Sequence, residues 1–400
     1  MTGERLAYVA LGALVEPGSR ELGRLVRAAG PEVALERVCG GGASDTLTGT
    51  VSARLAASGV VPAGDPLRGD SARIADRIAE PLLERAEELK ARIATPADAD
   101  WPRRVDDLTR ISRERGDRLD RDTDPPLCLW LRGPVPLDRA LERSVAVVGA
   151  RAATAYGEHV TAELAHGLAE RGWSVVSGGA YGIDAMAHRA ALAGGGVTVA
   201  VLACGVDRPY PEGNANLLDR IGEEGVLMTE WPPGAAPHRL RFLTRNRLIA
   251  AATLGTVMVE AAARSGARQT LGRARALGRR ALVVPGPVTS ALSVGCHAEL
   301  RREGNRLVST VDEIVEEVGR IGDLAPEATG PRRPYDDLDP LAAQLLDAVP
   351  PRRARTAEEI AAEAGMSGRD ARRVLPLLVQ LGRVDVVAGG YRLSRTAPRR

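Results

Sequence analysis

Six short apolar runs between Ser144 and Gly286 constrain the fold of this chain more than any other feature. They read SVAVVG, WSVVSGG, VTVAVLACG, GVLMTE, GTVMVEA and ALVVPG, and stretches with helical spacing such as GEHVTAELAHGLAERG separate them. Strands that alternate with helices form largely parallel sheets covered by helices. The sequence therefore predicts an α/β fold, an extended Rossmann-like doubly wound parallel sheet, over residues 144–320.

Two smaller domains and two connectors flank this predicted sheet. Residues 1–93 predict a helical domain of the helix–hairpin–helix or SAM-like kind, because apolar residues recur at helical spacing around the turn EPGS. Glu16 in that turn favours a packing role over contact with a DNA backbone. Residues 94–143 predict a connecting segment with one strand. Residues 321–333, rich in proline, glycine and charge, predict a linker.

Residues 334–396 predict a winged-helix domain of three helices and a hairpin. TAEE from Thr356 is a capping box, and Gly389-Gly390 lies at a turn between two alternating strands. The third helix would carry Arg369, Arg372 and Arg373. Such a helix binds either DNA phosphates or a protein partner, and the sequence leaves both open.

Composition excludes several classes of function. The formal net charge of +2 provides no strongly basic field over the whole chain, so any contact with nucleic acid requires a local patch. Lys90 is the only lysine and lies outside any phosphate loop, which excludes a Walker motif and Schiff-base catalysis. The four cysteines form no CxxC pair and the five histidines have no metal-ligand spacing. We therefore expect no metal and no cofactor.

No apolar stretch reaches the length of a membrane span, and the N-terminus lacks the basic run and cleavage site of a signal peptide. We therefore expect a cytoplasmic protein that makes no contact with membranes.

Glycine-rich turns follow the predicted strands, at the sheet edge where ligands bind in doubly wound folds. Helix N-termini after such turns suit anions, because their free amides and dipole favour negative charge. Three such turns on one edge predict a ligand with several phosphates or a strand of nucleic acid. The candidate residues are Gly149 and Arg151 in VVGAR, Ser177, Gly178 and Gly179 in SGGAYG, and Ser265 and Gly266 in SGARQT.

The stretch HRLRFLTRNRLIA places the only phenylalanine, Phe242, among Arg239, Arg241, Arg245 and Arg247. Single-stranded nucleic acid binds to aromatic platforms flanked by guanidinium groups, at about 1–3 kcal/mol per stacked base. The alternative is that the phenylalanine anchors its segment in the core. We favour the binding interpretation, because the ring lies among cations and not in an apolar run.

Asp184 and His188 stand four residues apart after the SGGAYG turn, so both side chains face one side of a helix. An acid–base pair is one interpretation. The structural one is favoured: a carboxylate is stabilising in a first helical turn, and His188 would hydrogen-bond to it one turn later.

The motifs VVGAR, SGGAYGIDAMAH, VLACGVDRPYPEGN, TEWPPG, RFLTRNRLIA, VMVEAAARSGARQT, VVPG and SVGCH resemble those of the DNA-processing protein A family, DprA or Smf, in order and spacing. The resemblance covers Ser144 to about Thr310. It implies a protein without turnover that binds single-stranded DNA, protects incoming DNA and loads the RecA recombinase in natural transformation, as a homodimer.

Carried over by motif, the implied DNA site is Arg151, Ser177, Gly178, Gly179, Phe242, Arg245, Asn246 and Arg247, with Ser265 and Gly266 nearby. This chain departs from the family pattern at Leu243, where a proline is usual, and at SGARQTL, where SGSLITA is usual.

The competing class is a nucleotide-processing enzyme, because the fold resembles that of nucleotide phosphoribohydrolases. Glu260 at the end of GTVMVE would supply the carboxylate, yet the PGGxGTxxE motif of those enzymes is missing. A third interpretation, a protein-interaction adaptor, leaves the arginine-rich stretch unexplained.

Overall fold

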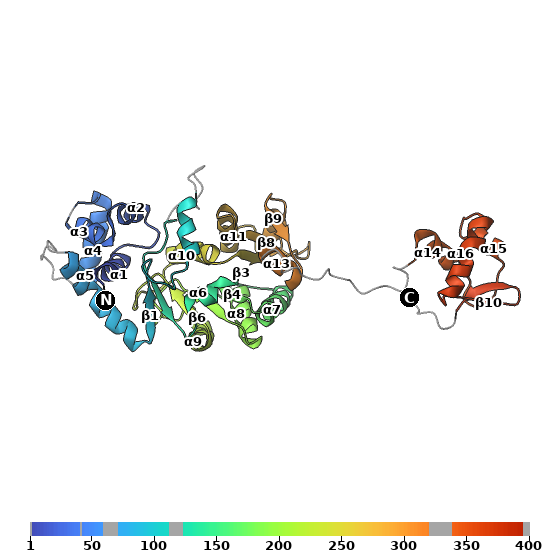
Figure 1. Ribbon diagram of the computed structural model, residues 1–400, viewed down its shortest axis with the longest axis horizontal. Coiled ribbons are helices and arrows are strands. Elements are labelled where there is room, and N and C mark those ends of the chain that lie inside the picture. Colours follow the sequence, from blue (N-terminus) through green and yellow to red (C-terminus); the bar gives the residue numbers. More distant parts are fainter. Residues whose placement is uncertain (1, 41, 59–70, 112–122, 320–337, 395–400) are drawn as a thin grey trace. The chain divides into compact units, whose positions relative to one another are not determined.

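The computed structural model describes residues 2–40, 42–58, 71–111, 123–319 and 338–394 (Figure 1). The chain divides into two compact units, Met1–Ala325 and Pro326–Arg400. The predicted linker at 321–333 lies outside the described residues, as do 334–337 and 395–396 of the predicted winged helix.

The first unit contains a nine-stranded sheet in the order β1-β2-β6-β5-β4-β3-β7-β8-β9. The strands from β6 to β9 in this order pair in parallel, which confirms the predicted doubly wound sheet, whereas β1 and β2 are antiparallel additions at one edge. The strands are β1 (Ala91–Ala94), β2 (Leu129–Arg132), β3 (Ser144–Val148), β4 (Ser174–Ser177), β5 (Thr198–Val201), β6 (Val226–Thr229), β7 (Gly255–Met258), β8 (Arg280–Val283) and β9 (Asn305–Leu307).

Helices cover both faces of the sheet, because alternate residues of its central strands are apolar on both sides. In β3, Val145 and Val147 pack with α7, α8 and α13, while Ala146 and Val148 pack with α6, α10, α11 and α12. α7 and α8 lie next to each other (Figure 1). These helices are α6 (Leu137–Glu142), α7 (Ala155–Glu170), α8 (Ile183–Ala193), α10 (Arg239–Ala252), α11 (Gly266–Ala276), α12 (Val294–Leu300) and α13 (Val311–Val318), and α9 (Ala215–Glu224) packs beside α8.

The N-terminal region is helical, as the sequence predicts, and buries its own apolar cluster around Leu11, Leu35 and Ile74. Its helices are α1 (Gly3–Leu14), α2 (Arg20–Ala29), α3 (Pro31–Gly40), α4 (Asp45–Ser58) and α5 (Ser71–Glu88).

The segment 94–143, predicted as a connecting segment with one strand, contains that strand and two helical elements. It holds β2, α6 and a 3₁₀ helix (Arg103–Arg110), and the predicted boundary after residue 93 falls inside β1. β1 was not predicted, and it pairs antiparallel with β2 at the edge of the sheet.

The second unit has the predicted order of three helices followed by a hairpin. The elements are α14 (Pro340–Ala348), α15 (Ala357–Glu363), α16 (Gly368–Gln380), β10 (Val384–Val387) and β11 (Gly390–Leu393). The capping box of Thr356 and Glu359 forms, and β10 pairs with β11 in antiparallel register. The assignment as a winged helix stays a prediction.

Candidate nucleic-acid interface

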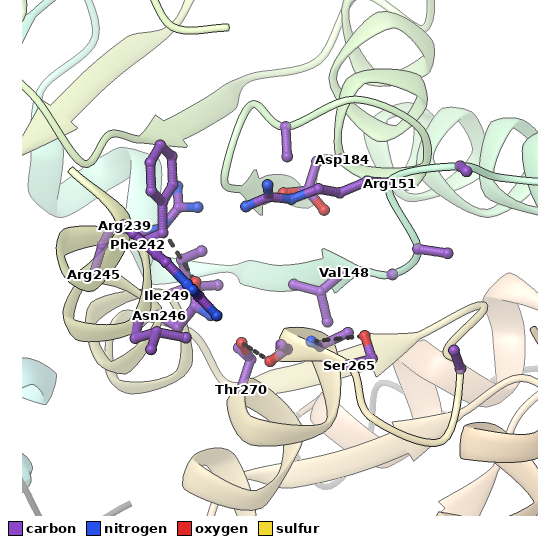
Figure 2. Close-up of a pocket in the computed structure, with 18 of the residues that line it drawn as sticks. Val148, Arg151, Asp184, Arg239, Phe242, Arg245, Asn246, Ile249, Ser265 and Thr270 are labelled. Carbon is purple, nitrogen blue, oxygen red and sulfur yellow. Dashed lines mark hydrogen bonds between the residues drawn. The ribbon is translucent and has the colours of Figure 1, made fainter. Parts of the chain in front are cut away.

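A cleft of about 630 Å³ opens at the carboxyl edge of the sheet. Its walls are the end of β3 with the loop that follows, one side of α10, and the first turn of α11 (Figure 2). Six of the ten residues of the implied DNA site line it, as does the candidate Gly149: the six are Arg151, Phe242, Arg245, Asn246, Ser265 and Gly266. We call this hollow the DNA cleft, after the ligand that the sequence leads us to expect there.

A glycine holds the Arg151 loop in place. Gly182 has a φ of 72°, and a Cβ there would lie 2.3 Å from the Ala150 carbonyl oxygen. The backbone N–H of Ile183 donates to that same oxygen at 3.1 Å. Only glycine permits this approach, so the turn before α8 fixes the loop that carries Arg151.

Phe242 is half-buried at the cleft and belongs to none of the apolar clusters of the described residues, so it is not a core anchor. Its ring centroid lies 5.5 Å from that of Tyr210 with the planes inclined by 50°. Tyr210 is 43% exposed. The guanidinium carbon of Arg151 lies 5.4 Å from the Phe242 centroid. The cleft therefore presents two adjoining rings and one cation.

Three arginines on the wall of the DNA cleft, Arg151, Arg239 and Arg264, have no carboxylate within ion-pair distance among the described residues. All three are exposed. The sequence predicts Arg151 as a site residue and places Arg239 among the guanidinium groups around Phe242, but the DNA site implied by the resemblance includes neither Arg239 nor Arg264. The signal available in the sequence was the position of Arg239 near Phe242 and of Arg264 directly before Ser265.

Arg247 does not reach the DNA cleft, contrary to the site predicted from the sequence. It is fully buried and its guanidinium donates to Glu230 at 2.6 Å. It lies in the last turns of α10, where residues 247–252 are all buried and Leu248 and Ile249 pack in the core. Its role in this structure is therefore an internal ion pair.

Arg245 lines the inner end of the cleft with its charge already engaged. It donates to the carbonyl oxygen of Gly178 at 2.7 Å and to that of Val201. Burial lowers the pKa of Arg245 to about 10, although Asp184 nearby favours the charged form. This guanidinium therefore stabilises the wall of the cleft and is not available to bind a phosphate.

Ser177, Gly178 and Gly179 are buried behind the DNA cleft and do not line it. The Ser177 hydroxyl donates to Val147 O at 2.6 Å, and the amide of Asn214 donates to Gly179 O at 3.0 Å. A Cβ on Gly178 would lie 2.4 Å from the Arg245 guanidinium. The SGG turn thus supports Arg245, which in turn supports the wall.

Ser265 lies in the lower wall of the cleft in Figure 2, and Asn246 lies on α10 at the left. Ser265 caps α11, its hydroxyl accepting from Ala267 N at 3.2 Å, and Gly266 opens that helix. The Asn246 side-chain oxygen accepts from Arg245 Nε at 3.2 Å, and its amide nitrogen faces Gly266. Helix N-termini of this kind favour anions.

Asp184 and His188 do not form an acid–base pair, and the hydrogen bond expected between them is wrong. Asp184 accepts from the Gly178 backbone N–H at 3.2 Å, and burial raises the pKa of its carboxyl group. His188 Nδ1 lies 2.7 Å from the Thr198 hydroxyl, which donates to Val175 O. Nδ1 therefore carries the proton, and burial lowers the pKa of His188 to about 3.

The carboxylate of Glu260 is also engaged in structural hydrogen bonds. Its carboxylate accepts from the Thr154 backbone N–H at 3.0 Å and from the Thr154 hydroxyl at 2.6 Å, and it is buried. It thereby stabilises the start of α7. The carboxylate required by the nucleotide-processing alternative is engaged in a structural contact.

Across the described ranges, no group of three or more histidine, cysteine, aspartate or glutamate residues could hold a metal ion. Nor does any helix in those ranges have the length and apolar character needed to cross a bilayer.

Comparison with known proteins agrees with this architecture. The model of the DNA recombination-mediator protein A family matches residues 92–319. A Mycobacterium tuberculosis protein that carries the name DNA processing protein DprA is 46% identical to this chain over 389 residues, which cover 97% of this chain and 94% of that protein. DNA processing protein DprA of Streptococcus pneumoniae is 40% identical over 194 residues, 48% of this chain and 67% of that protein.

The X-ray structure of DNA processing protein A (DprA) from Streptococcus pneumoniae has the same fold. It superposes with a TM-score of 0.59 at 28% identity, over 80% of this chain and 99% of that one. On these matches, together with the motifs that surround the cleft, the chain belongs to the DNA recombination-mediator protein A family.

Proposed function

We propose that the DNA cleft binds single-stranded DNA, with bases stacked on Phe242 and Tyr210 and phosphates held by Arg151, Arg239 and Arg264. The observation that carries this proposal is the meeting of two accessible rings and three unpaired guanidinium groups in one hollow. Unstacked bases and their phosphates need these two kinds of group side by side. The names of the relatives, which process DNA, support the same class of ligand.

We expect a strong preference for single strands over duplex, because the rings gain nothing from bases that remain paired and stacked. The measurement is fluorescence anisotropy with a labelled strand, alone and annealed to its complement, at one salt concentration. Equal affinities would contradict a stacking site.

Replacing Arg151, Arg239 or Arg264 with alanine should weaken binding and reduce the slope of log K against log salt by about 0.7 for each phosphate that the protein ceases to neutralise. Arg189, an exposed arginine on α8 outside the DNA cleft, is the matched control, and its alanine variant should keep the wild-type slope. Three unchanged slopes would place the phosphates elsewhere.

Phe242→Ala should lower affinity for a single strand by about 1–3 kcal/mol, because it removes one stacking face and the ring beneath Arg151. Phe242→Trp is the control that keeps an aromatic face and should retain most of the binding. Anisotropy titrations measure both variants, and an equal loss of affinity in Phe242→Ala and Phe242→Trp would contradict stacking on this ring.

We also propose that the protein works without turnover, since Asp184, His188 and Glu260 are all occupied by structural contacts. Wild-type protein incubated with nucleotides or DNA should release no base and no phosphate. Release that Glu260→Gln abolishes would instead support the nucleotide-processing enzyme.

The family resemblance further supports a role in transformation, in which a homodimer protects incoming DNA and passes it to RecA. The test is assembly of RecA on a single strand with and without this protein, beside its sedimentation mass. A monomer, or RecA assembly that the protein does not accelerate, would contradict this part of the proposal.

A further inference from the structure

A second hollow of about 500 Å³ adjoins the DNA cleft. Pro237 and His238, the two residues before α10, line both hollows and therefore form the ridge between them. The far wall of the second hollow comes from the N-terminal turn at Glu16 and Pro17. The two spaces thus share a wall, at the end of α10 that carries Phe242.

The second hollow has an apolar side and a fixed floor. Leu240 projects into it and is 63% exposed, an unusual state for a leucine on a packed helix. The floor is Arg241, which donates to Ala236 O at 2.8 Å and to Glu16 at 2.7 Å, and lies 5.6 Å from the centre of the Trp231 ring. These contacts within the protein fix the position of the Arg241 side chain.

The charge of the second hollow does not repel a phosphate backbone. Glu16 is its only acidic lining residue, and its carboxylate is paired with both Arg54 and Arg241. Trp231 Nε1 also donates to it at 2.9 Å. Exposed Arg239 stands next to the ridge on the side of the DNA cleft. A strand that crosses the ridge therefore meets neutralised or positive groups.

We propose that this second hollow, lined by Glu16, Pro17, Pro237, His238, Leu240 and Thr244, receives the continuation of the single strand whose bases lie in the DNA cleft. The inference rests on the proposed function. A base placed there contacts Leu240, and the phosphate before it crosses the ridge beside Arg239. The N-terminal helical region thereby becomes part of the DNA path through the turn at Glu16.

The test compares oligothymidylates of about 4 and about 16 nucleotides, a span that covers typical single-strand site sizes, on the full chain by anisotropy. Leu240→Asp places a carboxylate in the second hollow. It should weaken binding of the longer strand on the order of tenfold and leave the shorter strand within about twofold. Leu240→Phe keeps an apolar side chain in the second hollow, so this variant should bind the longer strand at least as well as wild type.

Leu341→Asp is the matched control, because Leu341 is also an exposed helical leucine and lies on α14 in the other unit. It should bind both strands as wild type does. An unchanged affinity of Leu240→Asp for the longer strand, or an equal loss on both lengths, would overturn the second hollow as part of the path. Phe242→Ala without effect on either strand would instead overturn the proposed function itself.

Discussion

Arg247→Met should lower the free energy of unfolding by about 3–5 kcal/mol, the largest effect expected of any single substitution discussed for this chain. The substitution leaves the carboxylate of Glu230 buried without its partner, 2.6 Å from where the guanidinium stood. Burial already raises the pKa of Glu230, against the effect of Arg247. Thermal or urea unfolding measures the loss, which corresponds to roughly 10 °C in Tm for the first unit.

The control is the double variant Arg247→Met with Glu230→Leu, which removes both charges. Glu230 Oε1 and the Nε and Nη1 atoms of Arg247 have no hydrogen-bond partner among the described residues, so the ion pair is incompletely satisfied. The double variant should therefore recover most of the stability that the single variant loses. Equal stability of Arg247→Met and wild type would show that the pair is not buried as described.

The salt dependence of DNA binding separates this arginine from those of the cleft. Below its new melting temperature, Arg247→Met should keep the wild-type salt slope, because its guanidinium contacts no phosphate. A salt slope reduced to the same extent as in Arg151→Ala would show instead that Arg247 contacts a phosphate.

Acidification from pH 6.5 towards pH 3 should destabilise the protein through His188, by about 1.4 kcal/mol per pH unit and roughly 4 kcal/mol in all. The folded-state pKa of this histidine is lowered to about 3, whereas the unfolded chain takes up the proton near pH 6.5. Between those values the unfolded state binds more protons than the folded state, so stability falls as pH falls. The physical cause is burial, because a proton on Nε2 would find no acceptor among the described residues.

His188→Gln removes this titration. Its free energy of unfolding, measured by urea at several values between pH 4.5 and 6.5, should fall less steeply with acid than that of the wild type. The substitution also loses packing, and this loss is the same at every pH. Comparing the slopes of the two proteins, and not their absolute stabilities, therefore removes its contribution. Identical slopes for His188→Gln and wild type would mean that this ring is charged in the folded protein.

The fold was predictable because its signals are local. Apolar runs of strand length alternate with helical stretches, and each strand from β3 to β8 coincides with one of the runs. The capping box at Thr356 needs only four consecutive residues, and it forms as predicted. β2 matches the one strand predicted in 94–143, whereas β1 was not predicted, because it pairs with β2, a partner in another part of the chain.

The candidate site was predictable as a region and only partly as a set of side chains. The sequence by itself determined that glycine turns, an arginine-rich stretch and a lone phenylalanine gather at one edge of a parallel sheet. Tyr210 lies in a loop remote in sequence from Phe242, and only the tertiary structure brings the rings to 5.5 Å. Its aromatic character in DRPYPEGN was the one available signal.

The arginines show most clearly what the tertiary structure alone decides. Arg239 and Arg247 stand eight residues apart on one helix and look alike in the sequence, yet one is exposed at the DNA cleft and the other is wholly buried. The first turns of α10 are exposed or half-buried and its last turns are buried, with Leu248 and Ile249 packed in the core of the sheet. Glu230 at the end of β6 supplies the counter-charge for the arginine in the buried part. Burial of the Arg247 guanidinium requires a carboxylate that compensates the loss of hydration, and that carboxylate comes from another part of the chain.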